Sequence, residues 1–104
     1  MAILLDNKTT GTGTAINTGS IGHEHCFYVE WAADVTAGVV SLETARTQGY
    51  TGTWAVIDTE SFEAGATNVF SYAGALLAVR ARITTTVAGG ADPGVTVEYV
   101  HSGD

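Results

Sequence analysis

The stretch Leu77-Ala-Val-Arg-Ala-Arg-Ile-Thr-Thr-Thr86 decides the fold class, because apolar and polar side chains alternate along it. One face holds Leu77, Val79, Ala81, Ile83 and Thr85, and the other holds Ala78, Arg80, Arg82, Thr84 and Thr86. Successive side chains of a strand point to opposite faces, so this pattern predicts a half-buried β-strand. The turn-forming sequence GGADPG follows at residues 89–94, and a second alternating run begins at Val95.

Other short runs of the chain show the same period of two. In His25–Ala32, the side chains of Phe27, Val29 and Trp31 share one face, and those of Cys26, Tyr28 and Glu30 share the other. Further strands are expected at residues 14–18, 39–44, 53–59, 67–72 and 95–99. About eight short strands separated by turns, without a helical period, predict an all-β antiparallel sandwich or barrel. The 104 residues are enough for one domain.

Charge and hydropathy exclude two classes of partner. The net charge is −7, and the basic residues Lys8, Arg46, Arg80 and Arg82 form no run, whereas nucleic-acid binding needs a clustered basic surface. No stretch approaches the roughly 20 apolar residues of a membrane span. The segment Met1–Leu5 lacks the basic start of a secretory signal. We therefore expect a protein made in a cytoplasm, with no nucleic-acid or membrane partner.

Two histidines form the one pattern that resembles a metal motif. His23 and His25 point the same way in a strand, and Glu30 completes an HxHxxxxE pattern that resembles the first metal motif of cupins. In a regular strand, however, Glu30 lies on the opposite face from His25, and no second motif surrounds His101. His23 and His25 are the candidate metal ligands, and the alternative is a solvated polar turn that enters a strand.

No catalytic arrangement stands out. His25 and Cys26 are adjacent, so they face opposite sides of a strand and do not form a nucleophile and base pair. Asp58, Glu60 and Glu63 are carboxylates of the kind that hydrolyse glycosides across a cleft, but a solvated acidic loop explains them as well. We expect no enzyme activity and no cofactor.

Four aromatic residues raise the question of carbohydrate binding. Trp31, Tyr50, Trp54 and Tyr72 are side chains of the kind that stack on sugars. Trp31 is expected in the core, and Tyr50, which lies between a glycine and a threonine in a loop, is the better surface candidate. The alternative is that these residues form core, with Tyr50 alone exposed.

The order of strands and turns in the second part of the chain resembles a known group of proteins. Residues 39–100 contain, in order, VVSLET, GTWAVI, SFEAGAT, LLAVRARITT, a turn with two glycines and VTVEYV. This succession is similar to small β-sandwich structural proteins of tailed bacteriophages, which occur as head decoration (cement) proteins and in some tail components. The resemblance implies a jelly-roll-like sandwich without an active site, which binds the major capsid protein as a dimer or trimer and stabilises the capsid.

Two surfaces are expected to contact such a partner. Residues 1–13 begin with the apolar Ile3, Leu4 and Leu5 and form either an extended N-terminal arm or an ordinary edge strand. Arg80 and Arg82 begin a polar row on one face of the long strand. The leading expectation is a virion protein on the capsid surface, assembled in the host cytoplasm. The alternatives are a tail or carbohydrate-binding module and a cupin-like metal-binding protein.

Overall fold

The computed structural model describes residues 2–17, 23–47, 49–64, 67–74 and 76–101, and within them it contains two antiparallel sheets of four strands. The strands are β1 (Ala2–Lys8), β2 (Ile16–Asn17), β3 (His23–Trp31), β4 (Val35–Ala45), β5 (Ala55–Ser61), β6 (Thr67–Gly74), β7 (Ala78–Gly89) and β8 (Val95–His101). The prediction of an all-β antiparallel sandwich with about eight strands is confirmed.

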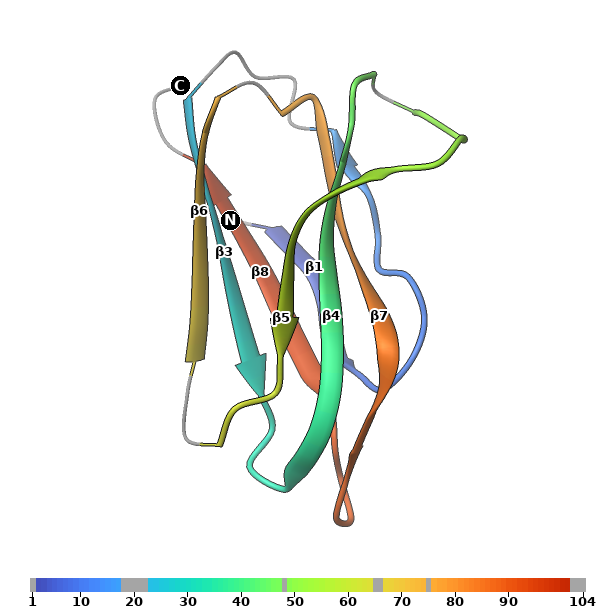
Figure 1. The fold of residues 1–104 in the computed structure, drawn as a ribbon, viewed down its shortest axis with the longest axis vertical. Coiled ribbons are helices and arrows are strands. Elements are labelled where there is room, and N and C mark those ends of the chain that lie inside the picture. Colours follow the sequence, from blue (N-terminus) through green and yellow to red (C-terminus); the bar gives the residue numbers. More distant parts are fainter. Residues whose placement is uncertain (1, 18–22, 48, 65–66, 75, 102–104) are drawn as a thin grey trace.

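The strand order is that of a jelly roll. One sheet has the order β1-β8-β3-β6, and the other has the order β2-β7-β4-β5, so the chain changes sheet at almost every connection (Figure 1). The first and last strands are neighbours, and Ala2 lies opposite Tyr99. Most strand pairs therefore join segments that are far apart in the sequence.

Alternation places the core between the two sheets as predicted. Phe27 and Val29 of β3 are fully buried, and Trp31 is nearly so. They pack in one cluster with apolar side chains of the facing sheet, among them Leu42 and Val79. Burial of these apolar side chains is the main favourable term in folding of such a small domain.

A register shift in the pairing of β4 with β5 decides which side chains of β5 face the core. Strict alternation places Asp58 on the same face as Val56. In the structure, Val56 lies opposite Glu43, whereas Asp58 lies opposite Leu42, which is a core residue. An extra residue in one strand of a pair turns the following side chains to the other face. Asp58 and Glu60 therefore face the space between the sheets and do not belong to a solvated loop.

Residues 2–13 are hydrogen-bonded along both sheets. Residues 2–8 form β1, which is an edge strand paired with β8 of the same chain. The following residues run along the free edge of β7: Val87 N donates to Thr9 O at 2.9 Å, and Gly13 N donates to Ala81 O at 2.8 Å. This segment satisfies the backbone groups that an open edge of β7 leaves unpaired.

The alternation of β3 is open to a direct test with two neighbouring residues. Phe27 is buried and Tyr28 is 43% exposed on the opposite face. We expect Phe27→Ala to lower the free energy of unfolding by about 3–5 kcal/mol. Tyr28→Ala is expected to lower it by less than about 1 kcal/mol. Chemical denaturation measures both, and equal losses would contradict the observed alternation.

Candidate functional site

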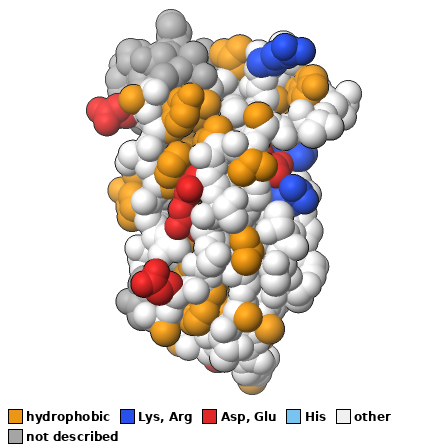
Figure 2. Space-filling view, in the orientation of Figure 1, with side chains coloured by type: hydrophobic (Ala, Val, Ile, Leu, Met, Phe, Trp, Pro, Cys, Tyr) orange, Lys and Arg blue, Asp and Glu red, His pale blue; other side chains and the backbone are white. Residues whose placement is uncertain are grey.

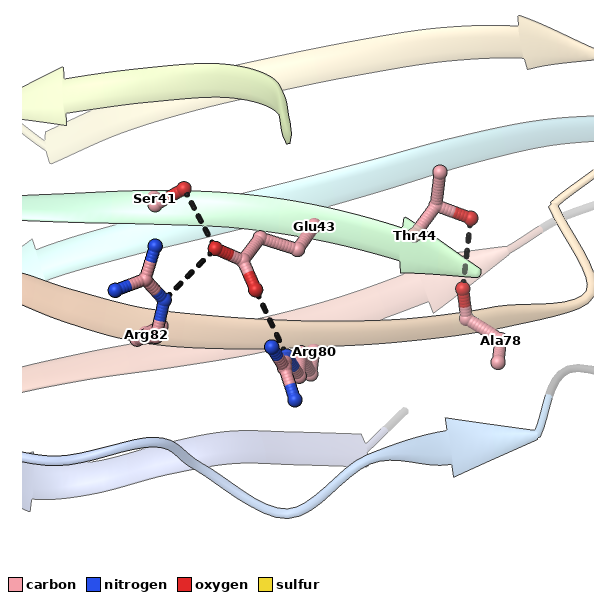
Figure 3. A network of polar contacts seen from close by, with 6 residues as sticks. All are labelled: Ser41, Glu43, Thr44, Ala78, Arg80 and Arg82. Carbon is pink, nitrogen blue, oxygen red and sulfur yellow. Dashed lines mark hydrogen bonds and ion pairs between the residues drawn. The ribbon is translucent and has the colours of Figure 1, made fainter. Parts of the chain in front are cut away.

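Two arginines of the polar row on β7 form ion pairs with one buried carboxylate of β4. Arg80 Nε donates to Glu43 Oε1 at 2.8 Å, and Arg82 Nε donates to Glu43 Oε2 at 2.9 Å. Ser41 Oγ also donates to Glu43 Oε2, at 3.1 Å (Figure 3). Glu43 is only 1% exposed although its strand face looks away from the core. Arg80 and Arg82 were expected to bind a partner; in the structure each donates its Nε–H to Glu43, and the Arg82 side chain is 42% exposed.

Electrostatics and packing hold this group together. Burial raises the pKa of Glu43, but the hydrogen bonds from Arg80, Arg82 and Ser41 outweigh it, so the pKa lies below its usual range. The Arg80 guanidinium also lies 4.5 Å from the ring centroid of Trp54. Trp54 is buried on this outer face with Ala45 and Ala78. These contacts therefore give the outer face of the sheet a small second core.

The outer face of the other sheet presents an exposed apolar row. Ile3 lies opposite Glu98, Glu98 lies opposite Tyr28, and Tyr28 lies opposite Val69, so these residues cross the four strands in one line. Ile3, Tyr28 and Val69 are 51%, 43% and 53% exposed. Leu4 and Leu5, which were expected at a partner surface together with Ile3, are buried in the core. We call Ile3, Tyr28, Val69 and Glu98 the outer row.

Carboxylates predominate around the outer row, and Lys8 at the end of β1 is the one Lys or Arg in the described strands of this sheet. β3 and β8 supply the outward carboxylates Glu24, Glu30 and Glu98, and the sequences of β3, β6 and β8 contain no Lys or Arg. A hydrogen bond with Cys26, on the same face, raises the pKa of Tyr28, so the phenol is neutral at ordinary pH. A partner that covers this face needs apolar side chains flanked by basic ones.

The two candidate metal ligands lie at the start of β3. His25 is fully buried, its Nδ1 is hydrogen-bonded to the Tyr99 hydroxyl, and the two rings stack with centroids 5.8 Å apart. The side chain of His23 lies outside the part of the chain that the structure describes. Among the described residues, His, Cys, Asp and Glu side chains do not gather in groups of three or more that would hold a metal ion.

Two carboxylates share the gap between the edge strands β5 and β6. Burial, followed by a hydrogen bond and charge repulsion from Asp58, raises the pKa of Glu60 to about 7. Asp58 Oδ2 is buried and has no hydrogen-bond partner among the described residues. Across the gap, Asn68 of β6 hydrogen-bonds to Glu60 and donates to the Ser61 carbonyl at 3.4 Å. Glu60 therefore changes its protonation state near neutral pH.

A pocket of about 540 Å³ opens at the end of the sandwich where β4 and β6 finish. Its walls include Tyr50 and Tyr72, two of the four predicted sugar-stacking candidates. The other two lie elsewhere: Trp31 is in the core, as predicted, and Trp54 lies under Arg80. Arg46 lines the same pocket, and no sequence motif indicated it.

Comparisons with known proteins found no match, so function is inferred from the geometry of the sites described above. No family model, no curated protein and no solved structure matches the chain. In the described part of the chain, no helix is long and apolar enough to cross a membrane.

The buried Glu43 should control the acid stability of the protein. Its lowered pKa stabilises the fold above the unfolded pKa of about 4.3, and this contribution is lost as pH falls through the folded pKa. We expect Glu43→Gln to lower the free energy of unfolding at pH 7 by about 1–3 kcal/mol. The exposed Glu24→Gln is the control, and an equal effect of both changes in denaturant titrations would contradict the role of the ion pairs.

Glu60 should destabilise the fold as pH rises. The unfolded carboxyl has its pKa near about 4.3, so between that pH and about 7 the folded protein holds a proton that the unfolded chain has released. Stability from this group is present below about pH 4 and is lost as pH rises through about 7. In thermal melts, the Glu60→Gln variant is therefore expected to show a smaller fall in stability as pH rises from about 4 to about 7. The exposed Glu63→Gln should retain the full fall, and a fall unchanged in Glu60→Gln would disprove the assignment.

Proposed function

We propose that this protein is a structural virion protein of a tailed bacteriophage, a head decoration protein that binds the assembled capsid and stabilises it. The observation that carries the proposal is the outer row, in which exposed apolar side chains of β1, β3 and β6 lie in one line with Glu98 of β8 between two of them. The jelly-roll topology and the resemblance of residues 39–100 to such proteins support it. The proposed partner is the major capsid protein, and the protein acts as a dimer or trimer on the capsid surface.

The outer row suits a docking role because it combines three kinds of contact. Tyr28 supplies a large amphipathic side chain near the middle of the sheet, and Ile3 and Val69 extend the apolar contact to both edge strands. Aromatic anchors with an apolar surround are typical of the energetically dominant part of an interface. Glu24, Glu30 and Glu98 then select a partner with basic residues at the rim.

Stabilisation follows from mass action. A protein that binds the assembled shell, and not its separated subunits, shifts the equilibrium toward the shell. No covalent step is needed, so the proposed role requires no catalytic group and no cofactor. The sheet under the outer row is well packed, because Phe27 and Val97 on its opposite face are fully buried in the core.

The proposal is tested by sedimenting the purified protein with capsid shells of the phage. Wild-type protein should sediment with expanded shells, and electron microscopy should show it at regular positions on them. Tyr28→Ala and Val69→Asp should weaken binding by at least about tenfold. Thr86→Asp is the control, because Thr86 is exposed on β7 of the other sheet. Absence of the wild-type protein from the shells would overturn the proposal.

A further inference from the structure

We propose that the pocket at the end of the sandwich binds a saccharide that carries a carboxylate. The pocket has a volume of about 540 Å³. Sites for small molecules commonly occupy about 300–1,000 Å³ and combine apolar walls with a few polar groups. Its lining comes from the end of β4, the β4–β5 connection, the start of β5, the end of β6 and the β6–β7 connection. The β4–β5 connection projects at the upper right in Figure 1.

Apolar and aromatic side chains form the walls of this pocket. Tyr72 is 37% exposed and Leu77 is 38% exposed, so both leave apolar surface open to a ligand. Leu76 is 2% exposed and joins the pocket to the core. A pyranose ring has one apolar face of C–H groups and a rim of hydroxyls. That face matches a tyrosine ring, and the rim matches the open side of the pocket.

The second aromatic wall, Tyr50, is held in place by its own loop. A Cβ atom at Gly52 would collide with the Tyr50 hydroxyl oxygen and Cζ, so the ring lies directly against the Gly52 backbone. Tyr50 also packs against the cluster that contains Trp54. Gly49 allows the turn before it, with a φ of +69°. An aromatic ring fixed before binding loses little entropy when a ligand stacks on it.

The polar groups of the pocket indicate the charge of the ligand. Arg46 is the only charged side chain of the lining, and within the described ranges it makes no ion pair. A free guanidinium matches a carboxylate with two parallel hydrogen bonds. Thr53 is exposed beside it, and the Thr44 hydroxyl, which donates to the Ala78 carbonyl at 2.8 Å, keeps its acceptor capacity. In a chain of net charge −7, a carboxylate-free pocket with a free arginine favours an acidic sugar.

This site is independent of the proposed capsid contact. Tyr72 lies opposite His25, which is buried between the sheets, so the Tyr72 side chain points to the inner side of β6. Val69 and Tyr28 of the outer row lie on the outer side of the same sheet. A protein docked through the outer row therefore leaves the pocket open to a saccharide.

A glycan array of neutral, sialylated and uronic-acid oligosaccharides tests the proposal with the whole chain. We expect binding to acidic members and weaker binding to the matching neutral ones. Calorimetric titration of the best acidic glycan should then show at least about tenfold weaker affinity for Tyr72→Ala and for Arg46→Gln. Thermal melts confirm that both variants fold. Tyr28→Ala is the matched control, because it removes an exposed tyrosine from the outer row and should retain wild-type glycan affinity.

Several outcomes overturn the saccharide site. An array without any bound acidic glycan rules it out, as does an affinity that Tyr72→Ala and Arg46→Gln both leave unchanged. Equal affinity for a uronic-acid glycan and its methyl ester rules out the carboxylate contact. The two proposals fail separately. Tyr28→Ala should weaken binding to capsid shells and leave glycan binding unchanged. Tyr72→Ala should weaken glycan binding and leave binding to shells unchanged.

Discussion

The pairing of β4 with β7 at the centre of one sheet buries side chains on both of its faces. On the inner face, Leu42 lies opposite Ala81, and both belong to the core. On the outer face, Glu43 lies opposite Arg80, and its second oxygen accepts from Arg82. A register slip of one residue would turn the apolar side chains outward and separate these ions. The ion group and the core therefore specify the same register, and the rest of the sandwich is built on it.

The alternation of apolar and polar residues within a strand was enough to predict which of its side chains are buried. The alternation of Phe27, Val29 and Trp31 was enough to place them in the core, because strand geometry alone decides which side chains share a face. Burial of Glu43 depends on Arg80, which is 37 residues away and reaches it only through the register of two strands. The faces of Asp58 and Glu60 depend on a bulge, and no single residue type signals its position.

The candidate sites were harder to predict than the core, because each one joins distant segments. Tyr50 and Tyr72 were both recognised as aromatic candidates, but only the fold brings the β4–β5 connection beside the end of β6. The outer row combines Ile3, Tyr28 and Val69 from three strands, and each of these residues alone is an ordinary exposed side chain. Arg82 also shows the effect of distance in sequence: its ion pair with Glu43 joins β7 to β4, and the pattern of neither strand alone indicated it.

The two outer faces of the sandwich are chemically different, and this difference favours one orientation on a partner. Figure 2 looks onto the side of β4, β5 and β7, where basic side chains lie toward the right and top of the view and most acidic ones lie toward the left. The face of β4 and β7 has already satisfied its Arg80–Glu43 contact internally, so a partner there must compete with it. The outer row has apolar groups exposed to water. Covering that row gains free energy without breaking an existing ion pair, so under the proposed function it is the face expected to contact the capsid.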